Sequence, residues 1–480
     1  MRRVILLLVA SVTLGACNPV PSAATPRPAK APPKAQAHGP WSYEITASAR
    51  GTTLAVEAQF PAGTSTDFGV GEGGDPFISD VVVLQGDRRT AVTGHAGHWL
   101  LAECAAGCRV SYTFGLRAAG VASKERSVAE VHGDVVEAPP SVWLLRPLDA
   151  GAGSPFRFHV TSPPGEAFAT GVFPVAGALD TYEGRTVEPF DLPYAAFGPL
   201  RRVPFAAGHV EVAYLPGTFS DEGAVATWVE RSAGVVEAYY GRPPVPRLLL
   251  LLHPVAGSKI GFGSTMGSSG AAIDMAVGKN ITTASLHDDW VLVHEMIHTA
   301  LPDVTRRHHW LEEGLATYVE SLARTRAGLV SAERVWKDWL DGMPNGQPEA
   351  GDEGLDRTHT WGRTYWGGAL FCLVADTEIR ARTDNRRSLD DALRAVLAEG
   401  GNISMSWPVE RVLDVGDRAT GVPVLRELFA RMAPRPERVD LDGLWRRLGV
   451  ARRGNSVVFD DTAPLAAVRL SMMAGPRAAP

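Results

Sequence analysis

Two short segments constrain this chain more than any other feature of its sequence. The first, VLVHEMIHTALP, holds His294, Glu295 and His298, and the second, WLEEGLATYVE, holds Glu313. Residues four apart on a helix lie one turn apart, about 6 Å along the axis, so both imidazoles can reach one metal ion while Glu295 lies beside it. A third ligand is still required, and the second segment offers the carboxylate of Glu313.

These side chains suit zinc. Neutral imidazoles of His294 and His298 with the carboxylate of Glu313 leave a fourth position on the ion for a water molecule. Zinc lowers the pKa of that water to ~7, and Glu295 can take its proton as the water attacks a carbonyl, then pass it to a leaving amine. The sequence therefore predicts one zinc ion per chain and hydrolytic chemistry.

The first forty residues predict export and anchoring rather than a folded domain. Arg2 and Arg3 precede an apolar run that is too short to span a bilayer as a mature helix, so residues 1–17 read as a signal peptide. Its end, Leu-Gly-Ala-Cys, resembles the lipobox of bacterial lipoproteins, in which the cysteine, here Cys17, carries lipid. Residues 18–40, rich in Pro and Ala, predict an extended linker.

Location and partners follow from the same features. Asn18 follows Cys17, where Asp would favour the inner membrane, so we expect a lipid anchor in the outer membrane of a bacterial envelope, with the protein facing the periplasm or the surface. In such an oxidising space Cys104 and Cys108 can form a disulfide; as metal ligands they lack a second pair. A net charge of −6 without a basic block argues against nucleic acid as a partner.

The remaining chain divides into two expected domains of an α+β protein. Residues 41–208 alternate in short runs between Gly, Pro and Asp turns, which is typical of an all-β sandwich. In residues 209–480, the apolar run at 247–255 is short enough for a buried strand, and 271–277 alternates like an edge or second strand, so the two predict a small sheet. Helical spacing starts at Ser285 and recurs to the C-terminal part, which predicts a helical lobe.

A family resemblance rests first on the second segment. WLEEGLATYVE is similar to the WLNEGFATYxE segment of gluzincin metallopeptidases such as aminopeptidase N, in which the Glu before Gly is the third zinc ligand. That position is Glu313 here, and Glu312 replaces the family's Asn. Glu320 is similar in placement to an outer-shell carboxylate that orients a ligand histidine, although a solvated helix Glu would look the same.

The resemblance continues beyond the predicted zinc site. TYWGGALFCLVADTEIRARTDNRRSLDDALRAVL resembles the YxKGxxxxxxLDxxIRxxTxxxxSLDDxxRxL stretch of the glycyl aminopeptidase family, a gluzincin branch with an N-terminal β domain. This resemblance implies a thermolysin-like catalytic domain. It also places Tyr365 where gluzincins carry the tyrosine whose hydroxyl stabilises the oxyanion of the tetrahedral intermediate.

One departure from the resembled families affects specificity. Aminopeptidases of this clan hold the free amine of the substrate with a Glu in an edge-strand motif, and the corresponding region here reads MGSSGAAID. Asp274 is the nearest carboxylate, but alternation along a strand could turn it to the other face. Backbone groups at Ser268, Ser269 and Gly270 could still bind a peptide by strand addition, so aminopeptidase and endopeptidase activity both stay open.

The sequence thus predicts a zinc metallopeptidase that is tethered by lipid and cuts peptides in the cell envelope. Two alternatives remain: an inactive peptide-binding lipoprotein on a peptidase scaffold, and a zinc hydrolase of a non-peptide amide or ester. His308 and His309 also invite a metal-binding interpretation. Because adjacent side chains point apart, we expect packing or solvent-facing roles for both.

Overall fold

The computed structural model describes residues 40–123, 125, 127–187 and 190–474, which confirm the predicted α+β class. The predicted signal peptide, the predicted lipidation site Cys17 and nearly all of the predicted linker lie outside these residues. Within the described residues, no helix combines the length and the apolar character needed to cross a bilayer. The described residues pack together as one compact unit.

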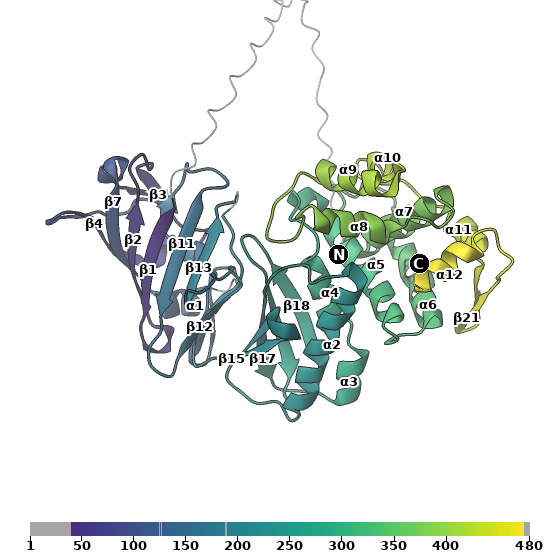
Figure 1. Ribbon diagram of the computed structural model, residues 1–480, viewed down its shortest axis with the longest axis horizontal. Coiled ribbons are helices and arrows are strands. Elements are labelled where there is room, and N and C mark those ends of the chain that lie inside the picture. Colours follow the sequence, from purple (N-terminus) through teal and green to yellow (C-terminus); the bar gives the residue numbers. More distant parts are fainter. Residues whose placement is uncertain (1–39, 124, 126, 188–189, 475–480) are drawn as a thin grey trace, which may run out of the picture. The chain divides into compact units, whose positions relative to one another are not determined.

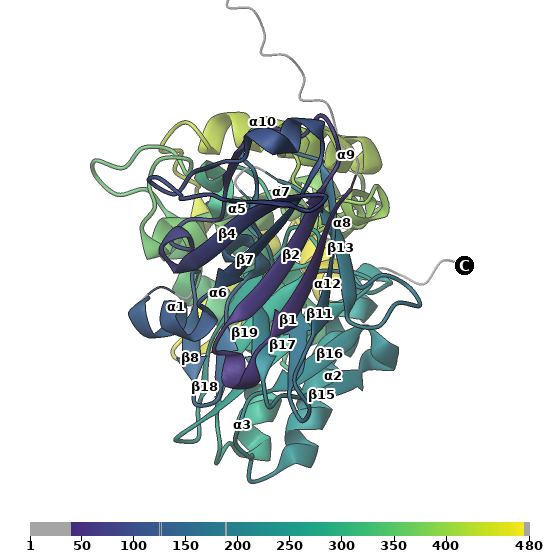
Figure 2. The same ribbon diagram turned by 90° about the vertical axis from the view of Figure 1, so that its left-hand side faces the viewer.

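Strands are the main regular elements of the chain from Trp41 to Tyr214. The largest sheet has the order β13-β11-β1-β2-β7-β4-β5 (Figures 1 and 2). In β1, WSYEITA, and in β2, LAVEAQF, every second residue is buried, because successive side chains of a strand point to opposite faces. The bounds are β1 Trp41–Ala47, β2 Leu54–Phe60, β4 Ile78–Gln85, β5 Arg88–Ala91, β7 Cys108–Phe114, β11 Pro155–Thr161 and β13 Thr181–Arg185.

Two smaller sheets complete this β region. One has the order β12-β14-β9-β8 and the other β10-β3-β6. Their bounds are β3 Asp67–Gly69, β6 Trp99–Leu100, β8 Glu130–His132, β9 Val135–Glu137, β10 Arg146–Pro147, β12 Ala167–Thr170 and β14 Ala195–Gly198. The ring of Trp143 packs edge-on against Phe158, Phe168 and Phe197 at centroid distances of 5.7 to 6.4 Å, in the core that the sheets share.

The predicted disulfide is present. Cys104 and Cys108 are bonded, with their Cα atoms 4.6 Å apart. The loop that they close contains most of the short 3-10 helix η3 (Ala102–Ala106), and Cys108 begins β7. Cys372 is a buried free thiol in the helix α7 (Gly368–Arg382).

A second large sheet, β15-β16-β17-β19-β18, connects the β region to the helices. Its bounds are β15 Arg201–Phe205, β16 Val210–Tyr214, β17 Leu248–Val255, β18 Ile260–Met266 and β19 Ala272–Gly278. The domain boundary that we expected at Gly208 falls inside the β15–β16 hairpin, because the turn at Ala206–Gly208 joins two strands of one sheet.

Both faces of this sheet are covered, which explains the apolar run in β17. Leu248, Leu250 and Leu252 belong to the core beneath the helices, whereas Leu249 and Leu251 pack with residues of β9 and β14. Helices α2 (Glu222–Tyr240) and α4 (Val291–His298) contribute to the first of these cores. The sheet ends at β18, so one long side of that strand has no neighbouring strand in the sheet.

The predicted helix from Ser285 is divided in the structure. A short helix α3 (Thr283–Asp288) begins with Thr282 as its cap, and α4 begins separately at Val291. Asp289 separates them: its carboxylate accepts hydrogen bonds from the backbone N–H groups of Val291 and Leu292 and from the indole of Trp228. The prediction of one helix was wrong because the backbone of Asp289 is extended and its side chain satisfies the first N–H groups of α4, which the spacing of apolar residues could not reveal.

The helical lobe follows α4 (Figure 1). Its bounds are α5 His309–Arg326, α6 Ala332–Gly342, the π-helix η8 Gly362–Gly367, α7 Gly368–Arg382, α8 Leu389–Ala398, α9 Val409–Thr420, α10 Val424–Met432, α11 Leu441–Leu448 and α12 Ala466–Ala474, with a β20 (Val450–Arg453) and β21 (Ser456–Phe459) hairpin before α12.

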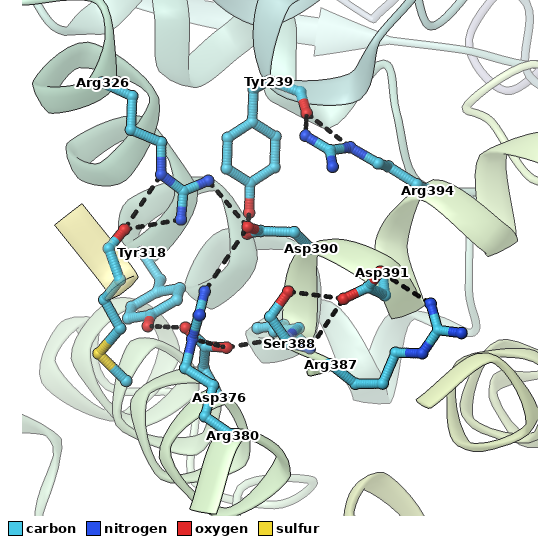
Figure 3. A network of polar contacts seen from close by, with 12 residues as sticks. Tyr239, Tyr318, Arg326, Asp376, Arg380, Arg387, Ser388, Asp390, Asp391 and Arg394 are labelled. Atoms are coloured by element: carbon cyan, nitrogen blue, oxygen red, sulfur yellow. Dashed lines mark hydrogen bonds and ion pairs between the residues drawn. The ribbon is translucent and has the colours of Figure 1, made fainter. Parts of the chain in front are cut away.

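Buried charges connect α2 with α5, α7 and α8 of this lobe (Figure 3). Asp376 of α7 accepts hydrogen bonds from Tyr318 of α5 and from Arg380. Asp390 of α8 accepts one from Tyr239 of α2, at 2.6 Å, and one from Arg326 of α5, at 2.9 Å. These pairs hold α2, α5, α7 and α8 in one arrangement.

Candidate active site

The metal-ligating groups predicted on α4 and α5 come together. Nε2 of His294 lies 3.3 Å and Nε2 of His298 lies 3.6 Å from Oε2 of Glu313. One ligand atom from each residue lies within 4.8 Å of the others. A tetrahedral zinc ion with bonds of ~2.0–2.1 Å separates its ligands by ~3.4 Å, so this donor set fits the ion.

The glycine after Glu313 has a packing role. A Cβ added at Gly314 would lie 2.2 Å from the backbone of Gly368, and one added at Gly368 would lie 2.0 Å from the carbonyl oxygen of Trp310. The backbones of α5 and α7 therefore touch at this point, and only glycine permits such an approach. The WLEEG sequence thus contains the candidate metal ligand Glu313 and also the contact that positions its helix.

The side chain of Glu295 extends from α4 to the edge strand β18. Its Oε2 accepts a hydrogen bond of 2.6 Å from the hydroxyl of Thr265. A Cβ added at Gly263 would lie 2.4 Å from Cγ of Glu295, so the absence of a side chain at Gly263 makes room for the carboxylate. Thr265 and Gly263 both belong to β18, and the sequence offered no signal that connected either of them with Glu295.

Tyr365 reaches the same cleft from the π-helix η8. Its ring stacks on His294 at a centroid distance of 6.3 Å and on Trp361 at 6.1 Å. Burial, together with the negative charges of Glu313 and Glu295, raises the pKa of the Tyr365 hydroxyl to about 12. The phenol therefore keeps its proton at neutral pH and can donate a hydrogen bond; π-helical turns recur at functional sites.

The structure gives the two adjacent histidines different environments. His308 is buried, and its Nδ1 lies 2.7 Å from Oδ1 of Asp356, so the predicted packing role is confirmed. His309 contacts the predicted ligand: its Nε2 lies 3.3 Å from Oε1 of Glu313, and its Nδ1 lies 3.0 Å from Glu312. Its pKa is raised to about 10, by Glu312 and then by Glu313. The spacing of four between His309 and Glu313 was the signal for this contact.

Glu320 has partners on its own helix. Its carboxylate accepts hydrogen bonds from the hydroxyl of Ser321 and from Arg324, one turn further along α5. Burial raises the pKa of Glu320 to about 7. The structure thus pairs Glu320 with Arg324, whereas the resemblance implied a contact with a ligand histidine; Nδ1 of His294 is buried without a hydrogen-bond partner among the described atoms.

The structure leaves little of the backbone at Ser268, Ser269 and Gly270 for the predicted strand addition. The N–H groups of Ser268 and Ser269 donate to the carbonyl oxygens of residues 403 and 404, and Gly270 forms a β-bridge with Val172. The hydroxyl of Ser269 bonds to the backbone of Arg185. Ser268 still lines the cleft, but β18 provides the edge beside it.

Asp274 does not serve the cleft either. It lies on β19, on the opposite face of the sheet from Ile273 and Met275, which pack in the core that α4 shares. Its Oδ1 is 2.5 Å from Nε2 of His253. Because alternate residues of a strand face opposite sides, Asp274 points away from α4 and cannot hold a substrate amine there.

The cleft around these residues has a volume of about 2070 Å³. Pockets for small ligands measure ~300–1,000 Å³, so this cleft has room for an extended chain. Its lining includes Phe262 of β18, which is 85% exposed, as well as Trp290 and Trp361, which are also exposed. Exposed aromatic side chains beside an unpaired strand edge form a surface suited to an extended apolar segment.

Comparison with known proteins gives the fold. No protein-family model matches the chain, and no curated protein matches it. An aminopeptidase N family protein from Idiomarina loihiensis is similar in structure at 14% identity, with a TM-score of 0.65 and coverage of 85% of this chain and 78% of that one.

A mutant of an M1 zinc metallopeptidase from Deinococcus radiodurans, bound to a Tyr-Ser-Ala substrate, is similar at 15% identity, with a TM-score of 0.52 and coverage of 84% and 96%. At such identities the likeness concerns the fold. The chain has the fold of the aminopeptidase N family and M1 zinc metallopeptidases, in agreement with its resemblance to gluzincin peptidases.

Proposed function

We propose that this chain is a zinc-dependent gluzincin peptidase that hydrolyses peptide bonds in the bacterial cell envelope. The observation that carries the proposal is the convergence of His294, His298, Glu313, Glu295 and Tyr365 on one cleft. The sheet that ends at β18, together with the helical lobe, would form a thermolysin-like catalytic domain. The signal peptide and lipobox of the sequence support a lipid anchor and an outer-membrane location.

His294, His298 and Glu313 would hold the zinc ion, which when bound supplies a Lewis acid that activates a water molecule for attack. Glu295 would take the proton as the carbonyl carbon is attacked and deliver it to the leaving amine, while Thr265 holds its carboxylate in place. Tyr365, protonated at neutral pH, would donate a hydrogen bond to the carbonyl oxygen as it becomes negative.

A peptide is the substrate that the cleft favours. The free side of β18 can pair with an extended backbone, and the cleft volume exceeds the need of a small ester or amide. The similar Deinococcus radiodurans enzyme was solved with a Tyr-Ser-Ala substrate. Asp274 faces away from this cleft, so both internal cleavage and cleavage from the amino terminus stay within the proposal.

The test compares wild type with Glu295→Gln on a mixed peptide library analysed by mass spectrometry. Wild type should cut peptides, and the variant should lose turnover while it retains zinc, because Glu295 is beside the ligands and is not one of them. Glu410→Gln, at the exposed rim of the same cleft, is the matched control and should keep full activity.

Each outcome separates the proposed peptidase from its alternatives. Wild-type protein that binds zinc at the cleft but cuts no peptide would indicate a binding protein, or a hydrolase of another amide or ester. Unchanged activity in Glu295→Gln would remove Glu295 from the mechanism. The positions of the cuts would distinguish trimming from internal cleavage.

A further inference from the structure

A second cluster of metal-ligating side chains lies on the opposite face of the sheet from α4. It combines His253 of β17 and Asp274 of β19 with His132 of β8 and Glu137 of β9. Glu130 of β8 lies at its edge, with Oε2 3.7 Å from Nε2 of His132. The cluster thus joins two strands of the β region to two strands of the sheet beneath the candidate active site.

Strand geometry explains why these side chains meet. In β17 the residues that face β9 and β14 are Leu249 and Leu251, and alternation puts His253 on the same face. Glu137 pairs across the ladder with Glu130, so their side chains share one face of the β8–β9 ribbon. The polar cluster therefore continues an otherwise apolar contact between two sheets.

The distances suit a shared ion. Nε2 of His253 lies 2.9 Å from Oε1 of Glu137 and 2.5 Å from Oδ1 of Asp274, and Nε2 of His132 lies 4.0 Å from the same Glu137 oxygen. One ligand atom each of His132, Glu137 and His253 lies within 4.8 Å of the others, so these three residues can share one ion. Oδ1 of Asp274 is closer to Nε2 of His253 than the ~3.4 Å that separates two ligands of tetrahedral zinc, so Asp274 lies beside this set and is not part of it. The imidazole rings of His132 and His253 meet edge to face at 4.4 Å.

Hydrogen bonding accounts for only part of this arrangement. Nε2 of His253 can carry one proton at most, yet it lies 2.9 Å from Oε1 of Glu137 and 2.5 Å from Oδ1 of Asp274. A single N–H group therefore faces two carboxylates in a buried place.

The charged groups of this cluster are buried. The side chains of His253, Glu137 and Asp274 are 7%, 2% and 1% exposed. Burial, with contributions from Asp274 and Glu130, raises the pKa of Glu137 to about 7, and His253 counteracts this rise. Burial lowers the pKa of His253, but its contacts with Asp274 and Glu137 prevail and raise it to about 10. A dication held by His132, Glu137 and His253 would lie beside the carboxylates of Glu137 and Asp274, which favours its binding.

We propose that His132, Glu137 and His253 bind a second divalent transition-metal ion of the zinc class. The site lies between two sheets, and the side chains of His253 and Glu137 are 7% and 2% exposed, so the ion is structural and not hydrolytic. Imidazole nitrogens favour zinc-like metals over calcium or magnesium, which prefer oxygen ligands alone. The ion would fasten the β8–β9 ribbon to β17, and this role is independent of the proposed peptidase activity.

The first test is metal analysis of the full chain, purified in detergent. Wild type should carry two equivalents of zinc per chain, and His294→Ala/His298→Ala should carry one. This variant leaves the buried cluster unchanged, so a folding defect there cannot hide the result. If the double variant, supplied with zinc and then dialysed, holds no metal, the cluster is a metal-free ion-pair network and the proposal is overturned.

The second test shows whether the zinc ion that remains in the double variant is bound at this cluster. In the His294→Ala/His298→Ala background, His132→Ala should lose it, because His132 is the least buried ligand and its removal leaves the core intact. His159→Ala, which removes a histidine from β11 on the β region's surface, is the matched control and should retain it. Added chelator should lower the melting temperature of the control but not of the His132→Ala variant. Retention of metal by the His132→Ala variant would contradict the assignment.

Discussion

Gly263→Ala tests whether the lack of a side chain at Gly263 positions Glu295, the proposed general base. The new Cβ would lie 2.4 Å from Cγ of Glu295 and 2.8 Å from its carboxyl carbon, whereas non-bonded carbons separate by ~3.5–4.0 Å. The carboxylate must therefore shift by about 1 Å, and a displacement of this size at a reacting group can cost ~100-fold in rate. That factor corresponds to about 2.7 kcal/mol of lost transition-state stabilisation.

The assay is kcat/KM on a peptide that wild type cleaves, with zinc content and melting temperature measured on the same protein. We expect a loss of about 100-fold with both other quantities nearly unchanged, because the displaced atoms belong to a side chain and not to backbone. Gly261→Ala, in the same strand but facing Ala276, is the matched control and should keep its activity. Wild-type kcat/KM in Gly263→Ala would refute the argument that Gly263 makes room for the base.

Three further predictions concern the phenol, a buried acid and the helix network. Tyr365→Phe should lower kcat by ~10²–10³-fold with little change in KM, because the hydrogen bond from Tyr365 forms only as the carbonyl oxygen becomes charged. Steady-state kinetics would measure this loss, and a change in KM alone would contradict the proposed role of Tyr365. Glu320 has its pKa raised from 4.5 to about 7, so the folded state binds more protons than the unfolded state in that interval. The free energy of unfolding of the metal-free protein should therefore fall by about 3 kcal/mol as pH rises from 4.5 to 7. Urea denaturation should show that Glu320→Gln removes this pH dependence. If the variant keeps the pH dependence of wild type, Glu320 is not the group responsible. Asp376→Ala should destabilise the fold by about 3 kcal/mol, because buried Arg380 would lose its nearer carboxylate and keep only Asp390, 3.7 Å away. Tyr318→Phe removes one hydrogen bond to the same carboxylate and should cost only about 2 kcal/mol. Equal losses in urea denaturation would contradict this difference.

The sequence predicted what short-range geometry determines. His294, Glu295 and His298 lie on one turn of one helix, so their mutual positions follow from helix spacing alone. Glu313 required a second helix to pack on the first, and the WLEEG segment indicated it. The β region could be predicted because apolar and polar residues alternate in runs such as WSYEITA. In the structure the same residues alternate between buried and exposed.

The failures involve contacts between distant segments. The spacing of Ser268 to Gly270 gave no sign that residues 403 and 404 would occupy their N–H groups. Thr265 and Gly263 come from a strand whose register relative to α4 is set by tertiary packing. Likewise, His253 looked like the end of an apolar strand, because its partner Glu137 lies far away in the chain and on another sheet.

The π-helical turn before α7 makes the length of this segment as important as its composition. A π turn contains one residue more than an α turn, and Gly368 at its end is fixed against the backbone of α5. Each residue of a helix rotates the chain by about 100°, so loss of one residue between Tyr365 and Gly368 would swing the phenol around the helix axis and out of the cleft. Variation among natural relatives of this chain should therefore retain Tyr365 and rarely insert or delete a residue in η8.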